Sequence, residues 1–311
     1  MSPRFRVVAV VDIGSNSTRL LIAEVEDRRV TCELERVSTV TRLGAGVDKD
    51  GRLHEDSMQR VFDTLSEYRQ RVEARHADQR LAVLTSAVRD SANGEEFAAA
   101  VKERYGFEPH ILRGDEEGRL TFLGATSERD PEDRTRTLVF DIGGGSTEMI
   151  IGSGHEVSFH VSTQAGVVRQ TERHLHHDPP PGDELRELSE DVARILAEAV
   201  PEAERTRVQK AIAVAGTATS LAAIAQDLDP YDPKKVHGYE LGIDQCAQIL
   251  RRLAAMPLEQ RRQVKGLHPD RAPTIIAGVL IFTEVARLFD LKKIEHSEHD
   301  ILRGAALGLS A

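Results

Sequence analysis

Short apolar runs that end at small or acidic residues are the main pattern along the chain. The run Val7–Val11 stops at Asp12, which predicts a buried first strand. Similar runs predict strands at Leu20–Val25, Leu81–Thr85, Glu108–Leu112, Met149–Ile151 and Ala211–Ala215. Helical spacing and composition predict helices at Glu95–Tyr105, Glu116–Gly124, Asp183–Ala199, from Gly216 through Ala225, and at Ala272–Phe289. Alternation of strands and helices predicts an α/β fold.

One sequence motif occurs twice, about one domain apart. VVDIGSNST at 10–18 and VFDIGGGST at 139–147 each place an aspartate between an apolar run and a Gly/Ser-rich turn. The aspartates are Asp12 and Asp141, 129 residues apart (141 − 12). A second apolar run follows each turn, so each copy predicts a β-hairpin with small residues at its tip. The repeat predicts two domains of duplicated fold with a cleft between them, and the length of 311 residues suits two domains.

Both hairpin tips have the composition of an anion-binding turn. Glycine lets the backbone approach a phosphate closely, and consecutive turn N–H groups form an anion-binding nest. The hydroxyls of Ser15, Ser17, Ser146 and Thr147 add donors, and the aspartates could hold Mg²⁺ through water. An ordinary hairpin turn is the alternative, and the duplication argues against it.

A third loop, Gly216-Thr217-Ala218-Thr219, lies between a predicted strand and a predicted helix. Small residues at a helix N-terminus suit an anion. Simple capping of the helix by Thr or Ser is the alternative explanation.

Carboxylates that could activate a water occur at two places. Gly114-Asp115-Glu116-Glu117-Gly118 forms an acidic cluster at a predicted helix start, where the helix dipole alone favours negative charge. Hydrolysis of a phosphoanhydride also needs a carboxylate that orients and deprotonates water. Glu148 follows the second hairpin turn directly. The chemistry alone leaves Glu116, Glu117 and Glu148 as open candidates.

Arginines next to these turns are candidate phosphate ligands because a guanidinium contacts phosphate through two parallel hydrogen bonds. They are Arg19 after the first turn, Arg89 after Thr85-Ser86-Ala87, and Arg271 at the start of the last predicted helix. Surface positions are the alternative for each. The histidines His174, His176 and His177, and likewise the pair His296 and His299, lack metal-ligand spacing, so we expect solvent-exposed positions.

Composition and charge exclude some classes of protein and indicate a cellular location. The net charge of −10 argues against a protein that coats nucleic acid, and the first apolar run is too short for a signal peptide or a membrane span. Cys32 and Cys246 are far apart and predict reduced thiols, so we expect a cytoplasmic protein without nucleic-acid or membrane partners.

Taken together, these motifs resemble those of the exopolyphosphatase / guanosine pentaphosphate phosphohydrolase (Ppx/GppA) family of the actin-like superfamily. The matching stretches run in order along nearly the whole chain: Asp12–Leu20, Thr85–Asn93, Gly114–Gly124, Asp141–Glu148, Gly216–Ser220, Val236–Gly238 and Asp270–Ala272. The resemblance implies two ribonuclease-H-like domains flanking a central cleft. We expect domain I at 1–124 with a C-terminal segment at about 300–311, and domain II at 125–299.

The resemblance also implies roles for the site residues. Glu117 matches the general base, Glu148 a second catalytic carboxylate, and Asp12 and Asp141 positions near the metal ion. Arg19, Arg89 and Arg271 match phosphate-binding arginines. The remaining substrate-binding positions are those of the three loops: Gly14, Ser15, Asn16, Ser17, Gly143, Gly144, Gly145, Ser146, Thr147, Gly216 and Thr217.

The implied activity is Mg²⁺-dependent release of orthophosphate from the end of inorganic polyphosphate, with Mn²⁺ as an alternative ion and K⁺ left open. This chain resembles the short, two-domain members, which favours short polyphosphate chains. Hydrolysis of pppGpp, and ppGpp sensing with little catalysis, stay open as alternatives, as does a kinase of the same superfamily. Many relatives form homodimers, and the resemblance extends that expectation to this chain.

Overall fold

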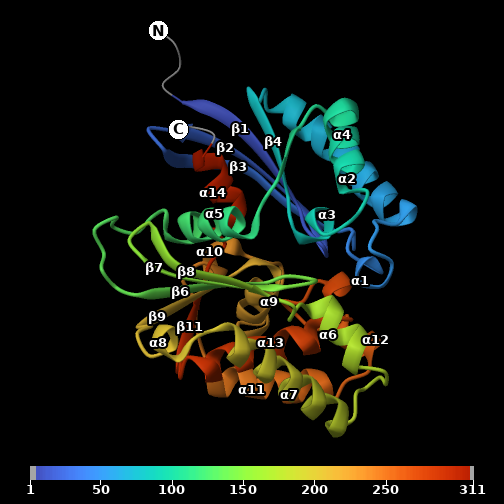
Figure 1. Ribbon diagram of the computed structural model, residues 1–311, viewed down its shortest axis with the longest axis vertical. Helices are drawn as coiled ribbons and strands as arrows, with labels where there is room; N and C mark the ends of the chain where they lie inside the picture. Colours follow the sequence, from blue (N-terminus) through green and yellow to red (C-terminus); the bar gives the residue numbers. More distant parts are fainter. Residues whose placement is uncertain (1–4, 309–311) are drawn as a thin grey trace. The chain divides into compact units, whose positions relative to one another are not determined.

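The computed structural model describes residues 5–308, except the side chain of Asp48. The chain divides into two units, Met1–Ser127 with His299–Ala311, and Glu128–Glu298. Residues 1–4 and 309–311, which the predicted domain bounds include, lie outside the described residues. Each unit is a mixed α/β structure with one sheet, which confirms the predicted fold class (Figure 1).

The first unit is built on a five-stranded sheet of order β3-β2-β1-β4-β5. Strands β1 to β3 form an antiparallel meander, and β4 and β5 continue parallel to β1. The elements are β1 (Arg6–Ile13), β2 (Ser17–Glu26), β3 (Arg29–Val40), α1 (Val47–Asp50), α2 (Glu55–Ala74), β4 (Gln79–Leu84), α3 (Ser86–Arg89), α4 (Gly94–Tyr105), β5 (Glu108–Ile111), α5 (Gly114–Thr126) and α14 (Ile301–Gly308).

Helices cover both faces of this sheet. Alternate residues of β1 point to opposite faces, so Ala9 and Val11 pack with α2 and α4, whereas Val8 and Val10 pack on the α14 side. In Figure 1, α14 (red) lies beside α5 (green). Their backbones are so close that a Cβ at Gly304 would overlap the Leu120 carbonyl. The last helix therefore completes the core of the unit that begins the chain.

The second unit repeats the plan with a six-stranded sheet of order β10-β11-β9-β6-β7-β8. Strands β6 to β8 form the meander, β9 and β11 run parallel to β6, and β10 is antiparallel to β11. The elements are β6 (Thr137–Ile142), β7 (Thr147–Ser153), β8 (Glu156–Thr163), α6 (Val167–His174), α7 (Gly182–Ala199), α8 (Glu202–Arg205), β9 (Lys210–Val214), α9 (Ala215–Ala225), α10 (Pro233–Val236), β10 (Glu240–Gly242), α11 (Ile243–Ala254), α12 (Leu258–Arg261), a 3₁₀ turn (Pro269–Arg271), α13 (Ile275–Leu288) and β11 (Lys293–His296).

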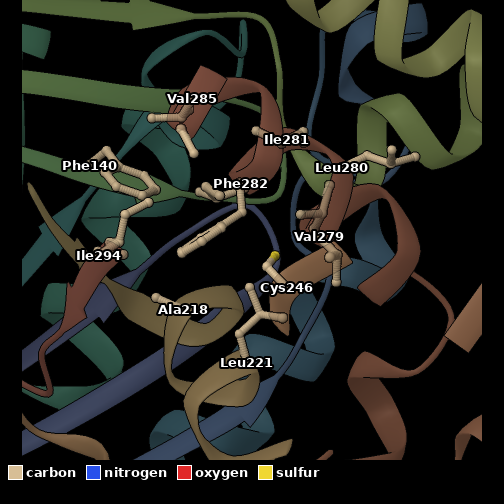
Figure 2. Close-up of a cluster of buried hydrophobic side chains, with 14 of the residues drawn as sticks. Phe140, Ala218, Leu221, Cys246, Val279, Leu280, Ile281, Phe282, Val285 and Ile294 are labelled. Atoms are coloured by element: carbon tan, nitrogen blue, oxygen red, sulfur yellow. The ribbon is translucent and has the colours of Figure 1, made fainter. Parts of the chain in front are cut away.

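Helix α13 is the centre of the second core. Every residue from Ile275 to Ala286 is buried, as expected for a helix that is apolar on all sides. Figure 2 shows its side chains packed against Phe140 of β6, Leu221 of α9 and Cys246 of α11. Arg271 was predicted to open this helix, but it lies in the preceding 3₁₀ turn. The 3₁₀ turn has proline at its first position, and α13 itself begins only after Thr274.

Candidate active site

The second glycine loop, Gly143–Ser146, joins β6 to β7 and rests on the first turn of α6. Three loop carbonyls accept hydrogen bonds from that turn: Val167 N to Gly143 O at 2.9 Å, Val168 N to Gly144 O at 2.8 Å and Arg169 Nε to Gly145 O at 2.9 Å. In a trans peptide the C=O and the following N–H point in opposite directions. The N–H groups of Gly144, Gly145 and Ser146 therefore point away from α6. Within residues 5–308 none of these three donates to a backbone carbonyl, so the loop has the donor pattern of an anion nest.

Gly166, which precedes α6, permits this arrangement and was not singled out from the sequence. A Cβ at Gly166 would overlap backbone atoms of Gly144, Gly145 and Ser146. Only glycine lets the start of α6 approach the loop backbone this closely. A lone glycine before a helix was the only signal in the sequence, and glycine is common there.

The first glycine loop is supported in the same way. Segment 41–44 donates to its carbonyls: Thr41 N and Arg42 N to Asn16 O at 3.0 and 2.9 Å, and Gly44 N to Ser15 O at 2.8 Å. The following N–H groups, those of Asn16 and Ser17, therefore point away from this segment. A Cβ at Gly44 would lie 2.8 Å from Ser15 Cβ, so Gly44 corresponds in the first unit to Gly166 in the second.

Two of the predicted hydroxyl ligands are engaged inside the protein. Thr147 is fully buried, and its Oγ1 donates to Ala165 O at 2.5 Å. Ser15 Oγ lies 3.0 Å from Ser86 Oγ. These hydroxyls stabilise the loops, while the backbone N–H groups remain directed away from the supporting segments.

The third loop lies at the start of α9 and adjoins the second. Thr217 Oγ1 donates to Ile142 O at 3.3 Å, which ties α9 to the end of β6. Arg271 Nη1 donates to Gly216 O at 2.5 Å, and its guanidinium lies where a Cβ of Gly216 would be. The structure therefore brings Arg271, Gly216 and Thr217 together at the same end of the second sheet as the Gly143–Ser146 loop.

The duplicated hairpins differ at one decisive position, seven residues after the aspartate. In the second unit Asp141 pairs in register with Glu148, so two carboxylates share one face of the sheet. In the first unit Asp12 pairs with Arg19. The second hairpin therefore concentrates negative charge where the first one contains an ion pair.

Arg19 is held between two buried carboxylates of the first unit. Its Nε and Nη2 lie 2.8 and 2.5 Å from Asp12 Oδ2, and its Nη1 contacts Asp300, the residue before α14. Burial raises the pKa of Asp12 despite the charge of Arg19. Burial also acts to raise the pKa of Asp300, but the charges of Arg19 and Arg36 outweigh it and lower that pKa. A phosphate that contacts Arg19 has to compete with both carboxylates.

A divalent cation fits the second hairpin better than the first. Mg²⁺ is usually held by one or two carboxylates together with substrate phosphates. Asp141 and Glu148 offer two carboxylates on one face. Asp12 Oδ1 is buried and accepts no hydrogen bond from the described part of the chain, but Oδ2 of the same carboxylate already binds Arg19. The donor set therefore favours Asp141 with Glu148 as the residues that would hold the ion.

Glu116 and Glu117, in the acidic cluster at the start of α5, make different contacts. Glu116 Oε2 accepts a hydrogen bond from Arg113 N at 3.2 Å and caps the helix. Glu117 is 9% exposed, and its Oε2 lies 2.9 Å from Arg89 Nη1. Arg89 also donates to Leu112 O at 3.1 Å, so it links α3 to the segment before α5. Of the two glutamates, Glu117 is the one placed beside a predicted phosphate ligand.

Three histidine predictions were wrong. The side chain of His299 is 12% exposed, and its Nε2 lies 3.2 Å from Arg303 Nη1. His174 is the last residue of α6, and its Nε2 lies 3.2 Å from Asp191 Oδ2, with the side chain 14% exposed. His296 is fully buried and stacks on Phe282 at 5.5 Å between ring centroids. Tertiary packing of α7 and α13 buries the rings of His174 and His296, and the local sequence carries no signal of that packing.

No helix among residues 5–308 is long and apolar enough to cross a membrane.

Known proteins are similar to this chain in both sequence and fold. The model of the Ppx/GppA phosphatase family matches residues 21–307. Exopolyphosphatase 2 of Mycobacterium tuberculosis is 35% identical, over 97% of this chain and 98% of its own length. The crystal structure of an exopolyphosphatase-like protein superposes with a TM-score of 0.90 at 32% identity, covering 99% of this chain and 98% of the other. The Aquifex aeolicus member of the Ppx/GppA family gives a TM-score of 0.82 at 30% identity, with 98% of both chains covered.

The two duplicated α/β units and their glycine hairpins define a protein of the actin-like fold class. Within that class, the chain belongs to the Ppx/GppA phosphatase family.

Proposed function

We propose that this protein hydrolyses the terminal phosphoanhydride bond of inorganic polyphosphate with the help of Mg²⁺. The observation that carries the proposal is the Gly143–Ser146 loop, whose three N–H groups point away from α6 beside two carboxylates on one sheet face. The 35% identical relative from M. tuberculosis is named an exopolyphosphatase, which favours polyphosphate as the substrate.

The proposed reaction uses the residues in distinct roles. Loop N–H groups and Arg271 bind phosphoryl oxygens of the chain end. Bound Mg²⁺ would neutralise charge on the phosphoryl oxygens, with Asp141 and Glu148 as its protein ligands. Glu117 accepts a proton from water as the water oxygen bonds to the terminal phosphorus. The bond to the bridging oxygen breaks, so orthophosphate leaves and the chain is one unit shorter. Catalysis then consists mainly of positioning and charge neutralisation.

The experiment compares phosphate release from polyphosphates of defined length and from pppGpp, side by side, with and without Mg²⁺. We expect release from short polyphosphate that depends on Mg²⁺. Release from pppGpp alone would make the chain a guanosine pentaphosphate phosphohydrolase. Tight binding of ppGpp with no release from either substrate would identify a sensor instead.

A further inference from the structure

The carboxylate of Glu148 is held at both of its oxygens by side chains of the neighbouring strand. Ser162 Oγ donates to Oε1 at 2.7 Å, and His160 Nε2 lies 3.1 Å from Oε2. Glu148 is 4% exposed, and the side chain of His160 is 14% exposed. A nearly buried carboxylate is stabilised in one place by such contacts on each oxygen.

The strand register explains why these three side chains meet. In the antiparallel pair β7 and β8, Glu148 lies opposite Ser162, and Ile150 lies opposite His160. Side chains two residues apart on a strand share a face, so Ser162 and His160 both lie on the face that carries Glu148. Met149 and Ile151 point to the other face, into the core around α13.

We propose that Ser162 and His160 are positioning residues that fix the rotamer of Glu148 for catalysis, an inference that rests on the proposed function. An ionised carboxylate accepts hydrogen bonds only, so the partner atom His160 Nε2 has to carry the proton. Each carboxylate oxygen has two lone pairs, and one donor on each leaves acceptor capacity for a cation or a water. The pair therefore orients Glu148 without blocking it.

A purely structural role is the competing explanation, and β8 contains a matched control for it. Ser158 lies on the same strand, two residues from His160, at an irregularity in the pairing with β7, and its hydroxyl donates to Ile151 O at 3.0 Å. Replacing Ser158 or Ser162 by alanine removes one serine hydrogen bond from β8 in each case. Only Ser162→Ala removes a contact with Glu148.

The test measures kcat, KM and the melting temperature for His160→Leu, Ser162→Ala and Ser158→Ala. We expect the first two to lower kcat by about 10- to 100-fold, with KM nearly unchanged, as is typical when a group that orients a functional side chain is removed. Ser158→Ala should keep the wild-type kcat. His160→Gln, which keeps a donor near the Nε2 position, and Ser162→Thr, which keeps the hydroxyl, should restore most of the activity.

Combining His160→Leu with Glu148→Gln separates positioning from other effects. If His160 acts through Glu148, adding His160→Leu to the Glu148→Gln variant lowers kcat little further. Wild-type kcat in both His160→Leu and Ser162→Ala, with Glu148→Gln inactive, would overturn the positioning role while leaving the proposed function intact.

If the wild-type protein itself releases no phosphate, the proposed function fails and crystal structures decide the inference. A Glu148 carboxylate that moves in His160→Leu and not in Ser158→Ala supports the positioning role. An unmoved carboxylate overturns it.

Discussion

Arg89 Nη1 lies 2.9 Å from Glu117 Oε2, so the predicted general base forms an ion pair with a predicted phosphate ligand. The arginine comes from the short helix α3 and the glutamate from the first turn of α5. The Arg89 guanidinium orients the Glu117 carboxylate, and a guanidinium is also well suited to a phosphoryl group. In the proposed reaction, this contact would link the residue that activates water to one that binds the substrate.

Glu117→Gln should lower turnover by about 100-fold or more, since the amide cannot accept a proton from water. The adjacent Glu116→Gln is the matched control, because Glu116 caps α5 and the amide oxygen can still accept the bond from Arg113 N. Steady-state phosphate release by the two variants checks the assignment. Equal turnover in Glu117→Gln and wild type would remove Glu117 from this role.

Arg89→Ala should lower kcat by about 10- to 100-fold and also raise KM, since both the orientation of Glu117 and a phosphate contact are lost. Arg113→Ala is the matched control, because it removes an exposed arginine that pairs with Asp115 at the start of α5. That control should leave both constants unchanged. A rise in KM alone would show that Arg89 binds substrate and does not orient the base.

Asp300→Asn should lower the free energy of unfolding at neutral pH by about 3 kcal/mol, because it leaves Arg19 and Arg36 with less buried negative charge. Asparagine can still accept the bond from Leu302 N that starts α14. The pKa of Asp300 is lowered on folding, so its contribution is present above its ordinary pKa and is lost as pH falls through the folded-state value. Urea unfolding of both proteins at pH 7 and near pH 3.5 measures the difference, which should shrink at the lower pH. The exposed Asp115→Asn variant should show no measurable change.

Gly166→Ala should reduce kcat/KM by at least about 10-fold, because the added Cβ displaces the Gly143–Ser146 backbone. Gly182→Ala is the control, since a Cβ there meets no atom within 4 Å. Alanine near the start of α7 should, if anything, stabilise the helix. Activity assays of both variants check the prediction, and full activity in Gly166→Ala would mean that the loop does not need its observed backbone path.

His296 should make the protein less stable as pH falls from about 6.5 to about 4. Burial lowers its pKa to about 4, so in this window the unfolded chain binds a proton that the folded protein excludes. The loss by pH 4 amounts to about 3 kcal/mol. His296→Phe keeps an aromatic ring beside Phe282 and should flatten this part of the stability profile. Melting temperatures measured across the window test it, and identical profiles for the two proteins would contradict it.

Local sequence patterns are sufficient to predict the strand–turn–strand hairpins, their duplication and the main helices. Strands β1, β2, β4 and β9 and helices α4, α5, α7 and α13 lie where their patterns predicted, with shifts of a few residues at the ends. These features are visible because they are local: an apolar run, a glycine turn and an aspartate are contiguous along the chain. Strand β3 and helix α2 were not predicted; β3 is an edge strand whose residues are mostly half-buried or exposed, so its apolar pattern is weak.

Which candidate side chains form contacts, and with which partner residues, depends on how the chain folds in three dimensions. Asp300 reaches Arg19 across 281 residues of sequence, and Gly44 and Gly166 matter because a second segment packs against each glycine loop. Likewise, Glu116 and Glu117 are adjacent in the sequence, yet one caps a helix and the other meets Arg89. Such contacts depend on strand register and helix packing, which bring together atoms that no local pattern relates.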